Sequence, residues 1–297
     1  MPLKDLYGAA NRPVISFELF PPKTPAGEKA LWGHVERLME FEPAYLTCTY
    51  GAGGSTQQRT LDIVGRFKKE WRIPVASHLT CVGSTRDQLR SFLSEASRRE
   101  IDYIVALRGD PPRGDDEFRP VPGGLAHANE LVALIRREFP SFGIAVAGYP
   151  EKHVEAPSLE VDIEHLRRKV DEGADIVLTQ LFYDNVDFFR FVERCRAAGI
   201  VVPIVPGILP ITSFAQIERI TSLCGARLPD RLVRKFEAAR DSAEEQRIGV
   251  EHATEQVRGL LEAGVPGIHF YVLNKSGATS DVLRAVGTSG YSESRGG

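Results

Sequence analysis

The stretch DYIVALRGDPP, residues 102–112, decides the fold, because a nearly all-apolar run ends in a charged segment with glycine and proline. Strands that are buried on both faces have this composition, and parallel sheets are built from such strands. Similar short segments recur along the chain and alternate with longer helical patterns. The predicted strands are residues 14–20, 44–50, 75–81, 102–108, 144–149, 175–181, 203–208 and 267–273.

Amphipathic patterns fill the gaps between these strands. Thr85 is placed to cap a helix that runs to about residue 99. Residues 158–171 carry an apolar stripe at helical spacing. A third helix is predicted over residues 243–263, with Gly264 in the position of a C-terminal cap.

This β-α order predicts an α/β protein, a (β/α)8 TIM barrel formed as one domain by residues 1–286. A doubly wound sheet is the alternative architecture. It would need a phosphate-binding glycine loop after a strand, and neither GxGxxG nor GxxxxGK[ST] occurs. Residues 111–124 are interpreted as a long loop after a strand, and residues 287–297 as a disordered tail.

Composition narrows the possible partners. The chain has 297 residues, 42% of them hydrophobic, which is enough for one large core. Its 37 basic and 40 acidic residues nearly balance, so we expect no nucleic-acid or membrane partner. The first residues hold no apolar run of the kind found in signal peptides, so we expect a cytoplasmic protein. The cysteines form no CxxC pair; we interpret them as reduced thiols rather than zinc ligands, and predict no metal site.

Polar residues cluster where the predicted strands end. In a (β/α)8 barrel, the chemistry lies at the carboxyl ends of the strands. Polar residues in or just after these ends are Glu18, Thr49, Tyr50, His78, Thr80, Arg108, Asp110, Tyr149, Gln180, Asn274 and Lys275. A set spread over most of the strands predicts a functional site at that end of the barrel.

Glu18 is unusual because it lies inside an otherwise apolar strand. In VISFELF, Ser16, Glu18 and Phe20 share one face of the strand. A buried carboxylate is costly unless it is paired or protonated. One interpretation is a buried salt bridge, with Arg108 as a candidate partner. The other is a general acid whose pKa is raised by burial.

Charged residues elsewhere allow two interpretations in the same way. Arg108 and Asp110 in RGDPP are either a local ion pair or part of a site. Arg168 and Lys169 lie one to two helical turns after Asp162. They form either a solvated helix face or a cationic patch.

These residues resemble the methylenetetrahydrofolate reductase family. The matching stretches are SFELFPPKT, TYGAGGST, SHLTC, ALRGDPP, YPEKHVEA, LRRKV, TQLFYDN, PGILPITSF and HFYVLNKS, which together run from about Phe17 to Lys275. The resemblance implies a (β/α)8 barrel that binds FAD without a Rossmann motif, in agreement with the missing GxGxxG. It also implies small-molecule folate and nicotinamide substrates and a homo-oligomer.

The resemblance also assigns roles by position. Glu18 matches the family's general acid, and Asp110 matches an aspartate beside the flavin and the pterin. Positions matching cofactor-binding residues are Thr49, Tyr50, Ala52, His78, Leu107, Arg108, Gly109, Asp110, His127, Ala128, Tyr149, His153, Ala156, Asp162, His165, Arg168 and Lys169. Positions matching substrate-binding residues are Glu18, Thr49, Asp110, Gln180, Gln216 and Lys275.

Three positions depart from the family pattern. His127 stands where the family often has tyrosine, Lys275 where arginine is common, and Ile220 where a phenylalanine stacks near the substrate. Lysine keeps the charge of arginine but loses its planar fork. These changes bear on folate and flavin affinity.

The implied reaction is a ping-pong hydride transfer from NADH or NADPH through FAD to 5,10-methylenetetrahydrofolate, giving 5-methyltetrahydrofolate. Glu18 would protonate the folate nitrogen that leaves when the five-membered ring opens. The alternative is a Schiff-base aldolase or lyase on the same barrel, with Lys275 as the nucleophile. A non-catalytic binding module would keep the barrel but has no need for an acid at position 18.

Overall fold

The computed structural model describes residues 3–8, 12–49, 57–111 and 118–287. Its strands form one sheet in the order β7-β6-β5-β4-β3-β2-β1-β9-β8, and all the paired strands are parallel. The strands are β1 (Val14–Leu19), β2 (Tyr45–Cys48), β3 (Val75–Thr80), β4 (Tyr103–Leu107), β5 (Gly143–Gly148), β6 (Ile176–Thr179), β7 (Ile204–Val205), β8 (Gly207–Ile208) and β9 (Gly267–Tyr271). The predicted α/β barrel is confirmed.

The barrel closes at Pro206, where the predicted strand 203–208 is divided into β7 and β8. β7 pairs with β6, while β8 pairs with β9 on the other side. Proline has no N–H to give to a ladder, but its carbonyl accepts from His269 N at 2.9 Å. Gly207 N donates a hydrogen bond to the Thr179 hydroxyl oxygen at 2.9 Å. One predicted strand therefore serves both edges of the sheet and completes the ring.

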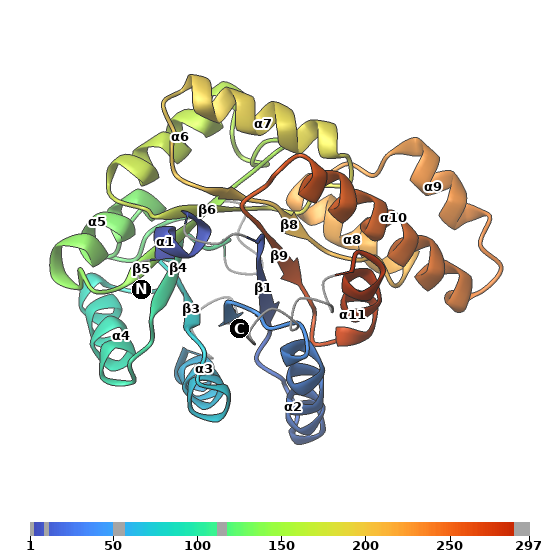
Figure 1. The fold of residues 1–297 in the computed structure, drawn as a ribbon. Helices are drawn as coiled ribbons and strands as arrows, with labels where there is room; N and C mark the ends of the chain where they lie inside the picture. The colour runs from blue at the N-terminus through green and yellow to red at the C-terminus, as the bar shows by residue number, and fades with distance from the viewer. Residues whose placement is uncertain (1–2, 9–11, 50–56, 112–117, 288–297) are drawn as a thin grey trace, which may run out of the picture.

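Helices surround this ring of strands (Figure 1). They are α1 (Leu3–Gly8), α2 (Pro25–Met39), α3 (Gln57–Trp71), α4 (Arg86–Arg98), α5 (Ala128–Glu138), α6 (Leu159–Asp171), α7 (Asn185–Ala197), α8 (Phe214–Cys224), α9 (Asp230–Glu237), α10 (Ser242–Glu262) and α11 (Ser276–Ala285). The three helices predicted in detail are confirmed as α4, α6 and α10. Gly264 has φ +74°, as expected for a residue that follows a helix in the left-handed conformation.

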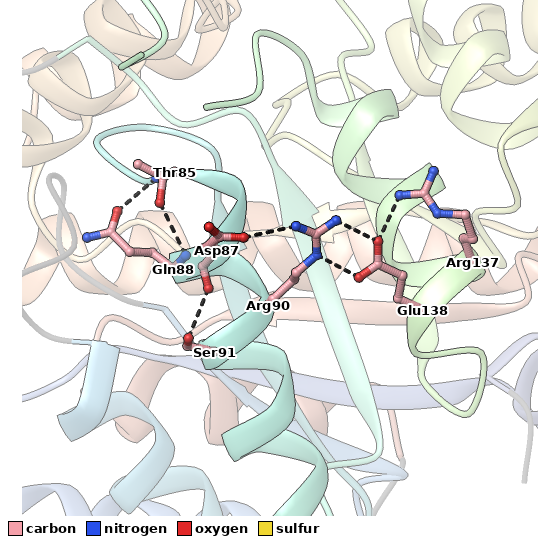
Figure 2. A network of polar contacts seen from close by, with 7 residues as sticks. All are labelled: Thr85, Asp87, Gln88, Arg90, Ser91, Arg137 and Glu138. Carbon is pink, nitrogen blue, oxygen red and sulfur yellow. Dashed lines mark hydrogen bonds and ion pairs between the residues drawn. The ribbon is translucent and has the colours of Figure 1, made fainter. Parts of the chain in front are cut away.

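Side-chain hydrogen bonds cap the start of α4 and link this helix to the end of α5, as Figure 2 shows. Thr85 and Gln88 form a capping box, in which Thr85 N donates to Gln88 Oε1 at 2.8 Å and Gln88 N donates to Thr85 Oγ1 at 3.3 Å. Arg90 then reaches Glu138 through two contacts of 2.8 and 3.0 Å. A helix whose start is set by sequence is thereby tied to its neighbour.

The alternation read from VISFELF is confirmed. Ile15, Phe17 and Leu19 pack outward against the helices in the largest hydrophobic cluster. Val14 belongs to a second cluster inside the barrel, and Ser16 and Glu18 contact His269 across the interior. The carboxylate therefore points into the barrel, as its strand position predicts.

Helix α1, which the sequence analysis did not predict, covers the amino-terminal end of the barrel. Its Leu3 and Tyr7 are buried in the cluster formed by the inward residues of the strands. A Cβ atom on Gly143 would lie 2.6 Å from Leu3 Cβ, so β5 needs a glycine where α1 crosses it. Since this end is filled, open space remains at the opposite, carboxyl end.

The four cysteines are free thiols, and three of them are buried. Among the residues that the structure places, no helix has the length and apolar character to cross a membrane. Within the same set, no group of histidine, cysteine and acidic residues is arranged to hold a metal ion. The predicted tail lies outside the described residues from position 288 onward.

Candidate active site

A cavity of about 830 Å³ opens at the carboxyl ends of the strands. This is near the upper limit for small-molecule sites, so it has room for more than one compact ligand. The predicted site residues that line it are Glu18, Thr49, His78, Leu107, Arg108, Gly109, Asp110, His127, Ala128, Tyr149, His153, Ala156, Asp162, His165, Arg168, Lys169 and Gln180. The structure thus brings together residues from positions 18 to 180.

Four predicted positions are not in this group. Gln216 and Lys275 line a separate hollow of about 20 Å³ that shares Leu209, Tyr271 and Leu273 with the main cavity. Tyr50 and Ala52 lie outside the described residues. Ile220, one of the departures from the family pattern, lines the main cavity itself.

Glu18 lies at the inner end of the cavity and is only 6% exposed. Its Oε2 atom is 3.0 Å from His78 Nε2 and 3.4 Å from His269 Nε2. The expected partner Arg108 was wrong, because Arg108 pairs elsewhere. Two imidazoles from β3 and β9 hold this carboxylate instead.

The expectation of a raised pKa for Glu18 was also wrong for the protein without ligands. Burial by itself raises this pKa, but the charge of the nearby His78 and the hydrogen bond from His269 outweigh it and lower the pKa to about 2. Glu18 therefore stands as a carboxylate that needs a proton from a neighbour before it can act as an acid.

Below Glu18, Ser16 and His269 extend the polar contacts into the barrel. Ser16 Oγ lies 2.8 Å from His269 Nδ1, and both residues are fully buried. The sequence analysis did not identify His269 as a site residue, because a single histidine in an apolar strand does not by itself indicate a functional role. The alternation of HFYV, set against that of VISFELF, could have placed it on the inward face.

Arg108 crosses the mouth of the cavity to Glu155 in the loop after β5. The two guanidinium contacts to the carboxylate are both 2.6 Å, which is bidentate geometry. The suggested local pair of Arg108 with Asp110 is not what the structure shows. Gly109 between them has φ +87°, and a Cβ there would lie 2.6 Å from Val82 Cγ1, so this turn requires glycine. The sequence analysis did not single out Glu155.

Arg168 and Lys169 on α6 form a cationic wall of the same cavity. Lys169 Nζ donates to the Ala147 carbonyl at 2.6 Å, and burial lowers the pKa of Lys169 to about 8 although Asp162 acts in the opposite direction. Arg168 is exposed beside it. Asp162 Oδ2 accepts from His153 N at 2.9 Å, which orders the loop between Tyr149 and α6. The suggestion that Arg168 and Lys169 are only a solvated helix face is wrong for Lys169.

Asn274 and Lys275 lie in the loop between β9 and α11. Asn274 holds the end of β1 through Phe20, with Phe20 N to Asn274 Oδ1 at 2.8 Å and Asn274 Nδ2 to Phe20 O at 2.7 Å. Lys275 is exposed and precedes α11. A Schiff-base lysine is activated by a desolvated pocket, and the exposed Lys275 lacks one. The site does not favour the aldolase alternative.

Fold and site together define a class: a (β/α)8 barrel with a cavity at the carboxyl ends of its strands, lined by cations of α6 and by a buried carboxylate that contacts two imidazoles. A model of the family described as methylenetetrahydrofolate reductase matches residues 4–287. The chain belongs to the methylenetetrahydrofolate reductase family.

Individual relatives agree with this family. The chain is 37% identical to 5,10-methylenetetrahydrofolate reductase of Escherichia coli (strain K12), over 96% of this chain and 93% of that protein. It is 38% identical to methylenetetrahydrofolate reductase (NADH) 1 of Zea mays, over 93% of this chain and 49% of that protein. The chain thus spans about half the length of the plant relatives it matches.

A solved structure shares the fold at low sequence identity. It is a Clostridium thermocellum protein described as binding two copies of 5-methyl-5,6,7,8-tetrahydrofolic acid. It has a TM-score of 0.63 and 17% identity, and the match covers 97% of this chain and 99% of that one. At this identity the likeness supports the fold alone.

Proposed function

We propose that the chain reduces 5,10-methylenetetrahydrofolate to 5-methyltetrahydrofolate with NADH or NADPH, using FAD as the cofactor. Family membership gives the reaction class. The observation that carries the proposal is Glu18, a buried carboxylate with two imidazole neighbours that faces a cavity large enough for a cofactor and a substrate. FAD would supply the hydride-transfer chemistry, as flavins do.

The residues of the cavity fit FAD. A dinucleotide needs an elongated space with apolar walls for its rings and cations for its pyrophosphate. Val105, Ala106 and Leu178 give apolar surface near the strand ends, while Arg168 and Lys169 supply cations on α6. Among the residues that the structure describes, Lys169 has only a neutral carbonyl as its hydrogen-bond acceptor, so a phosphate oxygen would be a stronger partner.

In the proposed reaction Glu18 gives a proton to the folate nitrogen that leaves on ring opening. Burial raises the pKa of Glu18, and its imidazole neighbours lower it. A ligand that covers the cavity removes water, and low polarity favours the uncharged carboxyl group. Filling the site would therefore raise the pKa of Glu18 and favour the protonated form that the reaction needs.

Other chain residues orient the substrate. Thr49 and Gln180 border the cavity on either side of the barrel and offer a hydroxyl and an amide to the pterin. Asp110, exposed at the outer end, would stabilise the cationic folate formed by ring opening. Gln216 and Lys275 in the side hollow would contact the part of folate that extends beyond the pterin. We also expect the protein to act as a homo-oligomer in the cytoplasm.

The test is spectroscopic. Purified protein should be yellow, and cofactor released by heat should be identified as FAD by chromatography. Under anaerobic conditions the visible flavin band should bleach with NADH or NADPH and return on addition of 5,10-methylenetetrahydrofolate. The proposal fails if FMN is found, if no flavin binds after reconstitution with FAD, or if folate does not restore the band. Titration with each nicotinamide separately determines which one the protein prefers.

A further inference from the structure

The turn that joins β9 to α11 has an unusual backbone. Leu273 and Asn274 are consecutive, and both have positive φ angles, +50° and +56°. This left-handed region is unfavourable for residues with a Cβ atom; asparagine adopts it more readily than most residues, but leucine does not. A strained backbone of this kind persists only where the surrounding contacts hold it.

The Asn274 side chain supplies two such contacts by continuing the β1–β9 ladder. Val272 N donates to Glu18 O at 3.1 Å, as in a regular parallel pair. The backbone then turns away from β1, and Val272 O accepts from Lys275 N at 3.0 Å. The Asn274 amide takes the place of the next peptide group: Phe20 N donates to Oδ1 at 2.8 Å, and Nδ2 donates to Phe20 O at 2.7 Å. We call these two hydrogen bonds the Asn274 clamp.

The other end of the turn is fixed to α2. Ser276, the first residue of α11, is fully buried. Its hydroxyl accepts from Arg37 Nε at 3.0 Å, and its N–H donates to His34 Nδ1 at 3.3 Å. Loss of the Asn274 amide would therefore release one end of the turn and leave α11 attached to the barrel.

The clamp holds two side chains that face open space. Phe20 and Leu273 both line the main cavity, and Leu273 also lines the small hollow that contains Gln216 and Lys275. Leu273 further packs against the hydrophobic cluster that includes Ile217 of α8. Leu273 therefore belongs to the wall that the two spaces share, where a ligand that reaches from one into the other must pass.

We infer that Asn274 is a positioning residue for the substrate: its clamp holds Phe20 and Leu273 in the cavity wall, where they set the path of the folate beyond the pterin. This inference rests on the proposed function, in which the hollow receives that part of the folate. Glu18 keeps its own backbone pairing with Tyr271, so the clamp acts on substrate binding rather than on the proton donor.

The experiment is Asn274→Gly in the FAD-loaded protein. Glycine adopts positive φ without strain but has no amide, so this variant keeps the turn and removes the clamp. The first measurement is hydrogen exchange of the Phe20 N–H, followed by NMR of protein labelled with ¹⁵N-phenylalanine and assigned with Phe20→Leu. We expect exchange at least ~10-fold faster in Asn274→Gly, because a hydrogen bond protects this N–H in the unmodified protein.

Steady-state kinetics give the second measurement. We expect the KM for 5,10-methylenetetrahydrofolate to rise by about ten-fold in Asn274→Gly, with kcat within about two-fold. A change confined to KM is the result expected when a variant loses binding that the substrate and the transition state share. The Kd for FAD should stay within about two-fold of that of the unmodified protein.

Two further variants calibrate the result. Asn274→Asp keeps an acceptor for Phe20 N but loses the donor to Phe20 O. It should raise KM less than Asn274→Gly does, and it remains informative if the glycine variant folds poorly. Asn185→Ala is the matched control, because it removes an amide that also donates to a backbone carbonyl, Gln256 O at 2.9 Å, outside the lining of both spaces. It should change neither measurement.

Failure of the inference and failure of the proposed function give different results. If the unmodified protein does not reduce 5,10-methylenetetrahydrofolate, the proposed function fails. The inference fails if the reaction occurs and Asn274→Gly keeps either the Phe20 exchange rate or the KM of the unmodified protein. Asparagine would then be suited to this position only by its tolerance of positive φ. A fall in kcat without a rise in KM would also overturn the inference, because it would place the effect on the chemistry instead of on substrate binding.

Discussion

The floor and the rim of the cavity hold charge in different ways. We define the floor as Glu18, His78, Ser16 and His269, and the rim as Arg108, Glu155, Arg168 and Lys169. The floor is almost closed to water, with Glu18 6% and His269 0% exposed. At the rim, the side chains of Arg108 and Glu155 are 22% and 45% exposed.

This difference separates two tasks. Fixed, dry partners control where a proton resides, since each contact acts strongly in a low-polarity environment. Exposed ion pairs contribute little stability and can exchange partners, which suits the capture of a charged ligand. The comparison predicts that floor variants change chemistry without changing cofactor affinity. Rim variants should instead change the affinity for the cofactor or its rates of binding and release, without changing chemistry.

The largest effect should come from Glu18→Gln on the floor. Glutamine keeps the shape and hydrogen-bonding capacity of the side chain but cannot donate an acidic proton. We expect return of the flavin band by 5,10-methylenetetrahydrofolate to slow by at least ~10²-fold. Bleaching by NADH or NADPH, which needs no such proton, should stay near normal. Anaerobic stopped-flow absorbance measures both rates.

A thermal melt of the same variant tests the purely structural role of Glu18. Removing one partner of a buried charged pair can cost ~3–5 kcal/mol of stability. If Glu18 were only such a partner, Glu18→Gln would lose stability and flavin, and both half-reactions would slow equally. That pattern would contradict the assignment of the floor to proton transfer.

The sequence predicted one half of this floor and missed the other. Strand alternation in VISFELF is a local signal, and it correctly turned Glu18 inward. His269 lies 251 residues away in the chain and meets Glu18 only because closure of the barrel pairs β1 with β9. The sign of the Glu18 pKa shift depends on these neighbours, so burial alone gave the wrong direction.

At the rim, residue types could be predicted from the sequence, but their partners could not. The strings RGDPP and LRRKV contain the cations, and strand order puts them at one end of the barrel. The contact between Arg108 and Glu155 joins two loops, whose paths no periodic pattern encodes. The division of the seventh strand at Pro206 escaped prediction for a similar reason: the apolar run continues through the proline, and only the pairing on each side reveals the break.

At the rim, Lys169→Ala should have the second largest effect. It removes a half-buried cation whose hydrogen bond to a phosphate would be worth ~1.5–3 kcal/mol. We therefore expect the Kd for FAD to rise by about ten-fold or more. Binding of FAD to flavin-free protein can be followed by quenching of flavin fluorescence.

Arg167→Ala is the matched control for Lys169→Ala. Arg167 lies on the same helix but pairs with Glu164 and Asp171 at 2.9 and 2.8 Å, outside the cavity lining. The Kd of the Arg167→Ala variant for FAD should equal that of the unmodified protein. Equal losses in the two variants would indicate damage to α6 rather than a phosphate contact by Lys169.

A smaller effect is expected from pH. Burial lowers the pKa of Lys169 to about 8, so the amino group is charged below pH 8 and loses its proton as the pH rises through that value. Affinity for FAD should therefore fall by about five-fold between pH 7 and pH 9. Lys169→Arg stays charged throughout this range, so the fall should disappear in that variant. A fall of the same size in Lys169→Arg would assign the pH dependence to another group.

The smallest effect should come from Glu155→Gln, which weakens the bidentate contact across the mouth of the cavity. The Arg108–Glu155 pair is partly exposed and so contributes at most ~1 kcal/mol, which corresponds to about five-fold in a rate. If the pair closes over FAD, its loss should speed both binding and release by about three-fold to five-fold and leave Kd within about two-fold. Stopped-flow fluorescence gives both rates.

Glu160→Gln is the control, since Glu160 pairs with Arg194 at 2.5 Å and does not line the cavity. A loss of affinity as large as that of Lys169→Ala would show that Glu155 takes part in binding FAD directly. Unchanged rates would show that the contact does not limit entry, and the rim would then act through its cations alone.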